Sequence, residues 1–212
     1  NTNIDIMRCA YERFCEEPGV DRESVIQIME ITMRNLMVSG QIDYGDFLAR
    51  ADMLVAGGMT VLISDYFEYY RLAAYLTRYT RAKIGISMGI GSLRELFDEK
   101  YYTELPGGIL ESLGRLFKND LKLYIYPLKD RTTGQLMTTD NLVIAEELRK
   151  LYGYLLDRGC IEQLTNQDEQ CLNVFSRDVL AKIASGDVTW ETMVPQEVAE
   201  VIKTRGYFGH GR

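Results

Sequence analysis

The spacing of hydrophobic residues near the start of the chain is that of amphipathic helices. Apolar residues recur every three or four positions over residues 4–14. Asp21 is placed as the N-cap of a second helix over 22–37, and a third helix is expected to run through Leu54. We therefore expect residues 1–57 to form a helical lead-in.

The hydrophobic period changes after this lead-in. Thr60–Ser64 is a short β-branched run typical of a buried strand, and residues 83–88 form a second run of this kind. Residues 66–79, between the two runs, have helical spacing, and another helix begins at Ser92. Alternation of strand and helix is typical of right-handed crossovers and a parallel sheet.

The rest of the chain continues the alternation. We expect a helix at 109–117, an alternating strand at 121–128 and a hairpin turn at 131–135. Three further helices are expected at 141–158, 173–183 and 195–204. We therefore expect an α/β fold, with a mostly parallel sheet flanked by helices and an N-terminal helical lead-in. The α/β region should span 58–212 and form one compact unit with the lead-in.

The charge balance disfavours polyanionic partners. The 212 residues include 24 Lys and Arg against 31 Asp and Glu, which gives a formal net charge of −7. Such a chain has no long-range attraction for nucleic acid or for an anionic membrane, so we expect neither as a partner. No apolar run approaches the ~20 residues of a membrane span, and no secretory leader is recognisable.

The cysteines and the single histidine exclude several kinds of site. No CxxC pair occurs among the four cysteines, which are Cys9, Cys15, Cys160 and Cys171. We therefore expect free thiols in a reducing cytoplasm and no metal site. His210 is close to the end of the chain, which argues against Ser-His-Asp or Cys-His catalysis.

Because the chain starts at Asn1 rather than Met, we expect a fragment of a longer protein.

The segment SMGIGSLR, residues 87–94, is the leading candidate for a binding site. It lies where a strand passes into a helix, with Gly89 and Gly91 in the turn and Ser92 as the expected N-cap. Backbone N–H groups at such a turn can approach an anion, and Arg94 could add a charge-assisted contact. Because Arg94 replaces the third glycine of GxGxxG, a tight turn without a ligand is the alternative.

Two further residues complete the candidate phosphate-binding set. Asp65 ends the first expected strand, where α/β enzymes often place a carboxylate; the alternative is that it caps the next helix. Arg71 shares a helical face with Tyr75 and Arg78, which would suit stacking and phosphate contacts with a nucleotide. The alternative is an ordinary amphipathic helix whose tyrosines fill the core.

Five stretches of the chain carry a family resemblance. They are SDYFEYYRLAAYLTRYT (64–80), LPGGILESLGRLF (105–117), LKLYIYP (121–127), NLVIAEELRKLYGYLLDRG (141–159) and MVPQEVAEVI (193–202). Together they resemble the C-terminal part of a family of long bacterial proteins, often labelled nicotinate- or nicotinamide-nucleotide adenylyltransferases. The resemblance covers most of residues 40–209 and implies a nucleotidyltransferase. Adenylyltransferases of that class use an H-x-G-H type motif, which Gly209-His210-Gly211 does not match, so no catalytic residue is transferred.

The sequence leads to two hypotheses about function. The first is a nucleotide- or phosphometabolite-binding region of a bacterial protein linked to NAD metabolism, with a small anionic metabolite as ligand and no particular cofactor indicated. The second is a non-catalytic oligomerisation or scaffolding region of a larger enzyme. The 14 tyrosines and 9 methionines are typical of interface patches, and we expect a homo-oligomer.

Overall fold

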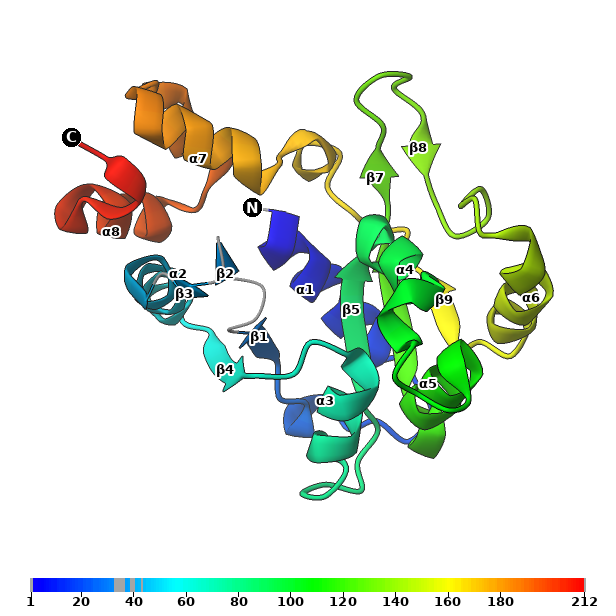
Figure 1. The fold of residues 1–212 in the computed structure, drawn as a ribbon. Helices are drawn as coiled ribbons and strands as arrows, with labels where there is room; N and C mark the ends of the chain where they lie inside the picture. The colour runs from blue at the N-terminus through cyan, green and yellow to red at the C-terminus, as the bar shows by residue number, and fades with distance from the viewer. Residues whose placement is uncertain (1, 33–36, 39–40, 43, 212) are drawn as a thin grey trace. The chain divides into compact units, whose positions relative to one another are not determined.

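The computed structural model describes residues 2–32, 37–38, 41–42 and 44–211 (Figure 1). The chain forms two compact units, each assembled from separate segments. Unit 1 comprises Asn1–Thr2, Ile26–Phe67 and Val174–Arg212, and unit 2 comprises Asn3–Val25 and Glu68–Asn173. The units therefore do not follow the expected division between 1–57 and 58–212, and the chain does not form one compact unit.

Unit 2 is built on a three-stranded parallel sheet in the order β5-β6-β9. The strands are β5 (Gly85–Gly89), β6 (Lys122–Tyr126) and β9 (Ile161–Gln163). The α-helices of the connections are α3 (Tyr69–Leu76) before β5, α4 (Ile90–Leu96) and α5 (Gly108–Leu116) before β6, and α6 (Arg149–Asp157) before β9. This alternation confirms the α/β class and the parallel sheet.

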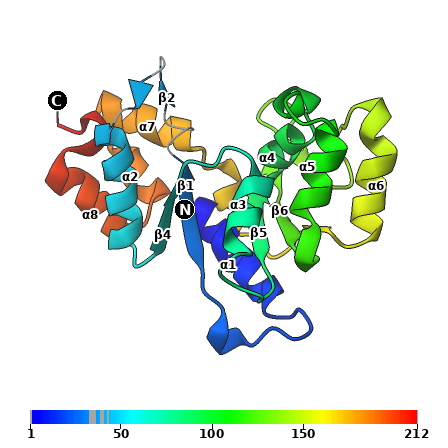
Figure 2. The same cartoon turned by 60° about the horizontal axis from the view of Figure 1, so that its bottom comes forward.

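The two faces of this sheet are covered by different helices. Leu123 and Ile125 on β6 are buried in the main core, with apolar residues of α3, α4, α5 and α6. Tyr124 and Tyr126, on the opposite face because side chains alternate along a strand, pack against α1 (Thr2–Phe14). Figures 1 and 2 show α1 and α5 on opposite sides of the sheet.

The segment between β6 and β9 confirms the expected hairpin but not the expected long helix. The hairpin turn expected over 131–135 is present, and it connects two short antiparallel strands, β7 (Leu128–Lys129) and β8 (Leu136–Met137). The single helix expected over 141–158 is instead a 3-10 turn, η5 (Glu146–Leu148), followed by α6. Leu142 and Ile144 are buried while Val143 between them is exposed, a period of two that belongs to extended chain. Gly159, with φ 67°, follows the helix as expected.

Unit 1 contains a two-stranded parallel sheet. β1 (Ile28–Thr32) pairs with β4 (Thr60–Ser64), and α2 (Tyr44–Ala56) lies between them in the chain. The remaining strands and α-helices of this unit are β2 (Met37–Val38), β3 (Gln41–Ile42), α7 (Ser176–Ser185) and α8 (Gln196–Arg205). β2 and β3 are antiparallel.

The helix expected over 22–37 is wrong within the described residues. Asp21 does act as an N-cap, accepting a hydrogen bond from the Glu23 N–H, but only for a 3-10 turn, η1 (Arg22–Ser24). β1 follows, because the apolar and β-branched residues after η1 also suit a strand, and pairing with β4 satisfies their backbone groups. The expected helical lead-in therefore contains two α-helices, α1 and α2, with η1 and the strands β1, β2 and β3 between them.

The core of unit 1 surrounds the only tryptophan. Trp190 lies on η7 (Val188–Met193), is 1% exposed, and clusters with buried residues of α7 and α8: Val179, Ile183, Ala199 and Ile202.

The two units also contain further 3-10 turns, which are η3 (Glu99–Tyr102), η4 (Lys118–Asp120), η6 (Cys171–Asn173) and η8 (Tyr207–Gly209). Across the described residues, no helix combines the length and the apolar character needed to cross a membrane.

Candidate functional site

The β5–α4 turn carries the two glycines singled out by the sequence. Gly89 ends β5 and is the N-cap residue of α4, with φ −75° and ψ 158°. A Cβ atom placed on Gly89 or on Gly91 would meet no neighbouring atom within 4 Å. Because neither glycine has a positive φ and neither is crowded, the fold itself does not require glycine at these positions.

Ser92 and Arg94 are both part of α4. Ser92 is the third residue of the helix, so the expectation that it is the N-cap is wrong; Gly89 has that position. The Arg94 side chain is exposed, and its Nη2 lies 3.9 Å from the Met137 Sδ on the β7–β8 hairpin. The pKa of Asp130 is lowered, first by the Thr133 N–H and in smaller part by Arg94. Arg94 is thus an exposed cation beside the hairpin.

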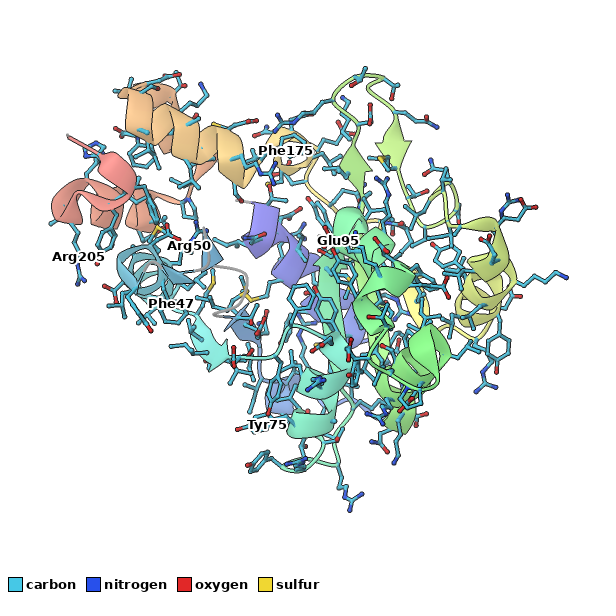
Figure 3. All side chains as sticks on the ribbon, viewed as in Figure 1. Phe47, Arg50, Tyr75, Glu95, Phe175 and Arg205 are labelled. Atoms are coloured by element: carbon cyan, nitrogen blue, oxygen red, sulfur yellow. The ribbon has the colours of Figure 1, made fainter. Side chains whose placement is uncertain are left out.

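Arg71 lies on α3 in contact with its own neighbours. Its Nε lies 3.1 Å from the Glu68 carboxylate and donates to the Tyr70 hydroxyl at 3.1 Å. The Tyr70 hydroxyl is the first cause that raises the pKa of Arg71, followed by the charge of Glu68. Tyr75, labelled in Figure 3, contacts Tyr79, with ring centroids 5.1 Å apart and ring planes tilted by 57°. A phosphate would compete with Glu68 for Arg71.

Asp65 belongs to a different unit from the other candidate residues. It follows β4 in unit 1, whereas the β5–α4 turn, Arg94 and Arg71 are in unit 2. The N-cap alternative for Asp65 is also wrong, because α3 begins at Tyr69 and its N-cap position is Glu68. Asp65 is therefore not part of the candidate site at the turn.

A polar cluster missed by the sequence analysis lies at the carboxyl end of β1 and β4. The Ser64 hydroxyl donates a hydrogen bond to the Glu30 carboxylate and accepts one from the Tyr66 N–H at 3.2 Å. Burial raises the pKa of Glu30, against the lowering effect of the Ser64 hydroxyl. The Thr32 side chain is in the same region and only 5% of Thr32 is exposed. The signal in the sequence was the alternation of apolar Met29 and Ile31 with polar Glu30 and Thr32.

A second buried polar cluster holds α1 against the sheet of unit 2. The Asp5 carboxylate accepts hydrogen bonds from the Tyr126 hydroxyl at 2.6 Å and the Asp168 N–H at 2.8 Å, and lies 2.7 Å from Arg8 Nη2. Burial alone would raise the pKa of Asp5, but these hydrogen bonds outweigh it and lower the pKa. Since these partners surround the carboxylate, we assign this cluster a structural role.

The only histidine is part of the aromatic core of unit 1. The His210 ring lies edge-on to Trp190, with ring centroids 5.9 Å apart. Among the described residues, no group of three or more His, Cys, Asp or Glu is arranged to hold a metal ion.

Comparison with known proteins gives no family model, no curated protein and no solved structure that matches this chain.

Proposed function

We propose that unit 2 binds a nucleotide or another phosphorylated metabolite at the β5–α4 turn. The observation that carries this proposal is the open space at Gly89 and Gly91, where the fold does not require glycine. Glycine there leaves open space beside the first turn of α4, at the carboxyl end of a parallel strand. Open α/β sheets bind their ligands at this end of the strands.

The chemistry around the turn favours an anionic ligand of modest size. Arg94 on α4 supplies an exposed cation, and Arg71 on α3 supplies a second if a phosphate displaces Glu68. The family resemblance supports a ligand from NAD metabolism, such as nicotinate mononucleotide or ATP. A nucleotidyl transfer on this chain would proceed without an H-x-G-H motif, since His210 is the only histidine.

The substitution Gly91→Ala tests the proposal. Alanine is favoured over glycine within a helix by about 0.5–1 kcal/mol, so we expect the unfolding free energy to rise. The new methyl group would point toward the helix N-terminus and cover the first-turn N–H groups, so we expect at least ten-fold weaker binding. The measurement is a thermal-shift and calorimetric titration with ATP, NAD, nicotinate mononucleotide and pyrophosphate.

Gly114→Ala is the matched control. Gly114 is exposed on α5 and also has open space at its Cβ position, so it should give the same gain in stability without loss of binding. The proposal is wrong if no ligand stabilises the wild-type chain, or if Gly91→Ala binds as tightly as Gly114→Ala.

An oligomerisation role is the second candidate, and an exposed apolar row on α2 favours it. Tyr44, Leu48 and Val55 are spaced four and seven residues apart, which places them on one face of the helix. Their exposed fractions are 66%, 58% and 61%. Rows of exposed apolar side chains are typical of association surfaces.

Leu48→Glu tests this second candidate. A charge in the middle of the row is expected to dissociate a homo-oligomer formed through α2, which sedimentation velocity over a concentration series would detect. Val143→Glu is the control, since Val143 is an exposed apolar residue of unit 2 whose chain neighbours Leu142 and Ile144 are buried. A wild-type chain that is monomeric throughout the series would rule this role out.

A further inference from the structure

The carboxyl end of the β1–β4 pair brings three polar side chains to one face. Glu30 and Thr32 are two residues apart on β1, and therefore point to the same side of the pair. Thr32 is the register partner of Ser64 on the parallel strand β4. The hydrogen bond from Ser64 to Glu30 confirms that the side chains of these two residues meet on that face.

Thr32 is the residue on which the inference rests. Its Oγ1 is buried and has no hydrogen-bond partner within the part of the chain that the structure describes. A buried hydroxyl without a partner costs free energy, and native proteins keep few of them. A ligand that hydrogen-bonds to Thr32 would remove that cost, and the strand ends are where such a ligand is expected.

The neighbouring carboxylate narrows the chemistry of the ligand. Ser64 donates to one oxygen of Glu30, which leaves the second oxygen as an acceptor on the same face. Within the described residues, the pKa of Glu30 is raised by burial and lowered by the Ser64 hydroxyl, and no Lys or Arg pairs with this carboxylate. A phosphate would be repelled here, and one carboxylate with two hydroxyls offers a metal ion few ligands. A neutral donor of hydrogen bonds fits best.

We propose that the carboxyl end of the β1–β4 pair binds a neutral polyol, of the sugar or ribose type, through Glu30 and Thr32. One ligand hydroxyl donates to the free Glu30 oxygen, and its neighbour hydrogen-bonds to Thr32 Oγ1. Because Glu30 and Thr32 point to the same side of one strand, a single ligand with two hydroxyls can contact both side chains. The site belongs to unit 1 and stands independently of the β5–α4 turn.

The experiment is a calorimetric titration of the chain with D-ribose, adenosine and 2′-deoxyadenosine. We expect D-ribose and adenosine to bind and 2′-deoxyadenosine to bind at least ten-fold more weakly, because one of its paired hydroxyls is missing. A response to D-ribose as well as to adenosine assigns the contact to the sugar. The proposal is overturned if adenosine and 2′-deoxyadenosine bind equally tightly and D-ribose does not bind, because the contact would then be made by the base.

Two variants locate the binding at this cluster. Thr32→Val keeps the side-chain shape and removes the unpaired hydroxyl, and Glu30→Gln removes a carboxylate whose raised pKa marks a cost of burial. We expect both variants to unfold at the same or a higher temperature than the wild type, and to bind at least ten-fold more weakly. Gain of stability with loss of binding separates a ligand site from a purely structural role.

Two controls complete the test. Thr60→Val makes the same change on the same face of β4, at the amino end of the strand, and should leave binding unchanged. Gly91→Ala should also leave it unchanged, since that glycine belongs to the other unit. The proposal is overturned if neither D-ribose nor adenosine binds, if Thr32→Val and Glu30→Gln bind like the wild type, or if Gly91→Ala abolishes binding. Should Thr32→Val not fold, Glu30→Gln still decides.

Discussion

Replacing Trp190 by alanine is expected to lower the unfolding free energy of unit 1 by about 3–5 kcal/mol. The indole is 1% exposed and lies among buried side chains of α7 and α8, so its removal leaves a large cavity. It also removes the ring against which His210 packs. Urea unfolding followed by far-UV circular dichroism measures the loss.

Trp190→Phe is the matched comparison. Phenylalanine fills most of the space and keeps an aromatic ring beside His210, so we expect a smaller loss than with alanine. Equal losses for both variants would contradict the cavity argument. A loss below about 1 kcal/mol for alanine would show that Trp190 is not central to this core.

Replacing Asp5 by asparagine is expected to destabilise unit 2 by about 2 kcal/mol at neutral pH, because buried hydrogen-bond donors would lose their carboxylate acceptor. The asparagine amide would present N–H donors to partners that are themselves donors: Tyr126, the Asp168 N–H and Arg8. Since Tyr126 is on β6 and Asp5 on α1, the change weakens the docking of α1 on the sheet. Tyr126→Phe, which removes one donor, should cost less.

The pH dependence of Asp5 provides a second measurement. Its pKa in the folded chain lies below the ordinary value of about 3.9, so the stabilisation is complete above that value and is lost as the pH falls through the folded-state pKa. Urea midpoints at pH 7 and at successively lower pH should therefore converge between wild type and Asp5→Asn in acid. A difference that stays constant down to low pH would contradict this assignment.

The parts of the fold that the sequence predicts well are those with strong local signals. The runs at Thr60–Ser64 and around Lys122–Tyr126 are strands, and the helix over 109–117 is α5. β9 escapes prediction because a three-residue strand such as Ile161–Gln163 has too few positions to show a period. It is defined by its pairing with β6, a contact distant in sequence.

β1 shows why a hydrophobic pattern can predict the wrong element. Apolar residues between Val25 and Leu36 fit a helical stripe, yet Ile28–Thr32 is a strand with burial that only partly alternates. A short apolar run suits both structures, and partner β4 decides between them. This error concealed a polar cluster, since Glu30 and Thr32 share a face on a strand but not on a helix.

The candidate phosphate site was predicted only in part. The sequence placed Gly89 and Gly91 at a strand–helix junction, and the structure has them there. It could not place Arg71, whose ion pair with Glu68 depends on the start of α3, or show that Asp65 belongs to another unit. Both facts depend on element boundaries and tertiary contacts rather than on local pattern.

The burial of the only tryptophan makes the two units optically distinguishable. Indole emission excited at its red edge comes from Trp190 alone and therefore follows the state of unit 1, whereas circular dichroism follows the helices of both units. Superimposable unfolding curves from the two signals would mean that the units unfold together, and separated curves that each has its own transition. The wild-type chain thus carries its own reporter of cooperativity, with no label or mutation required.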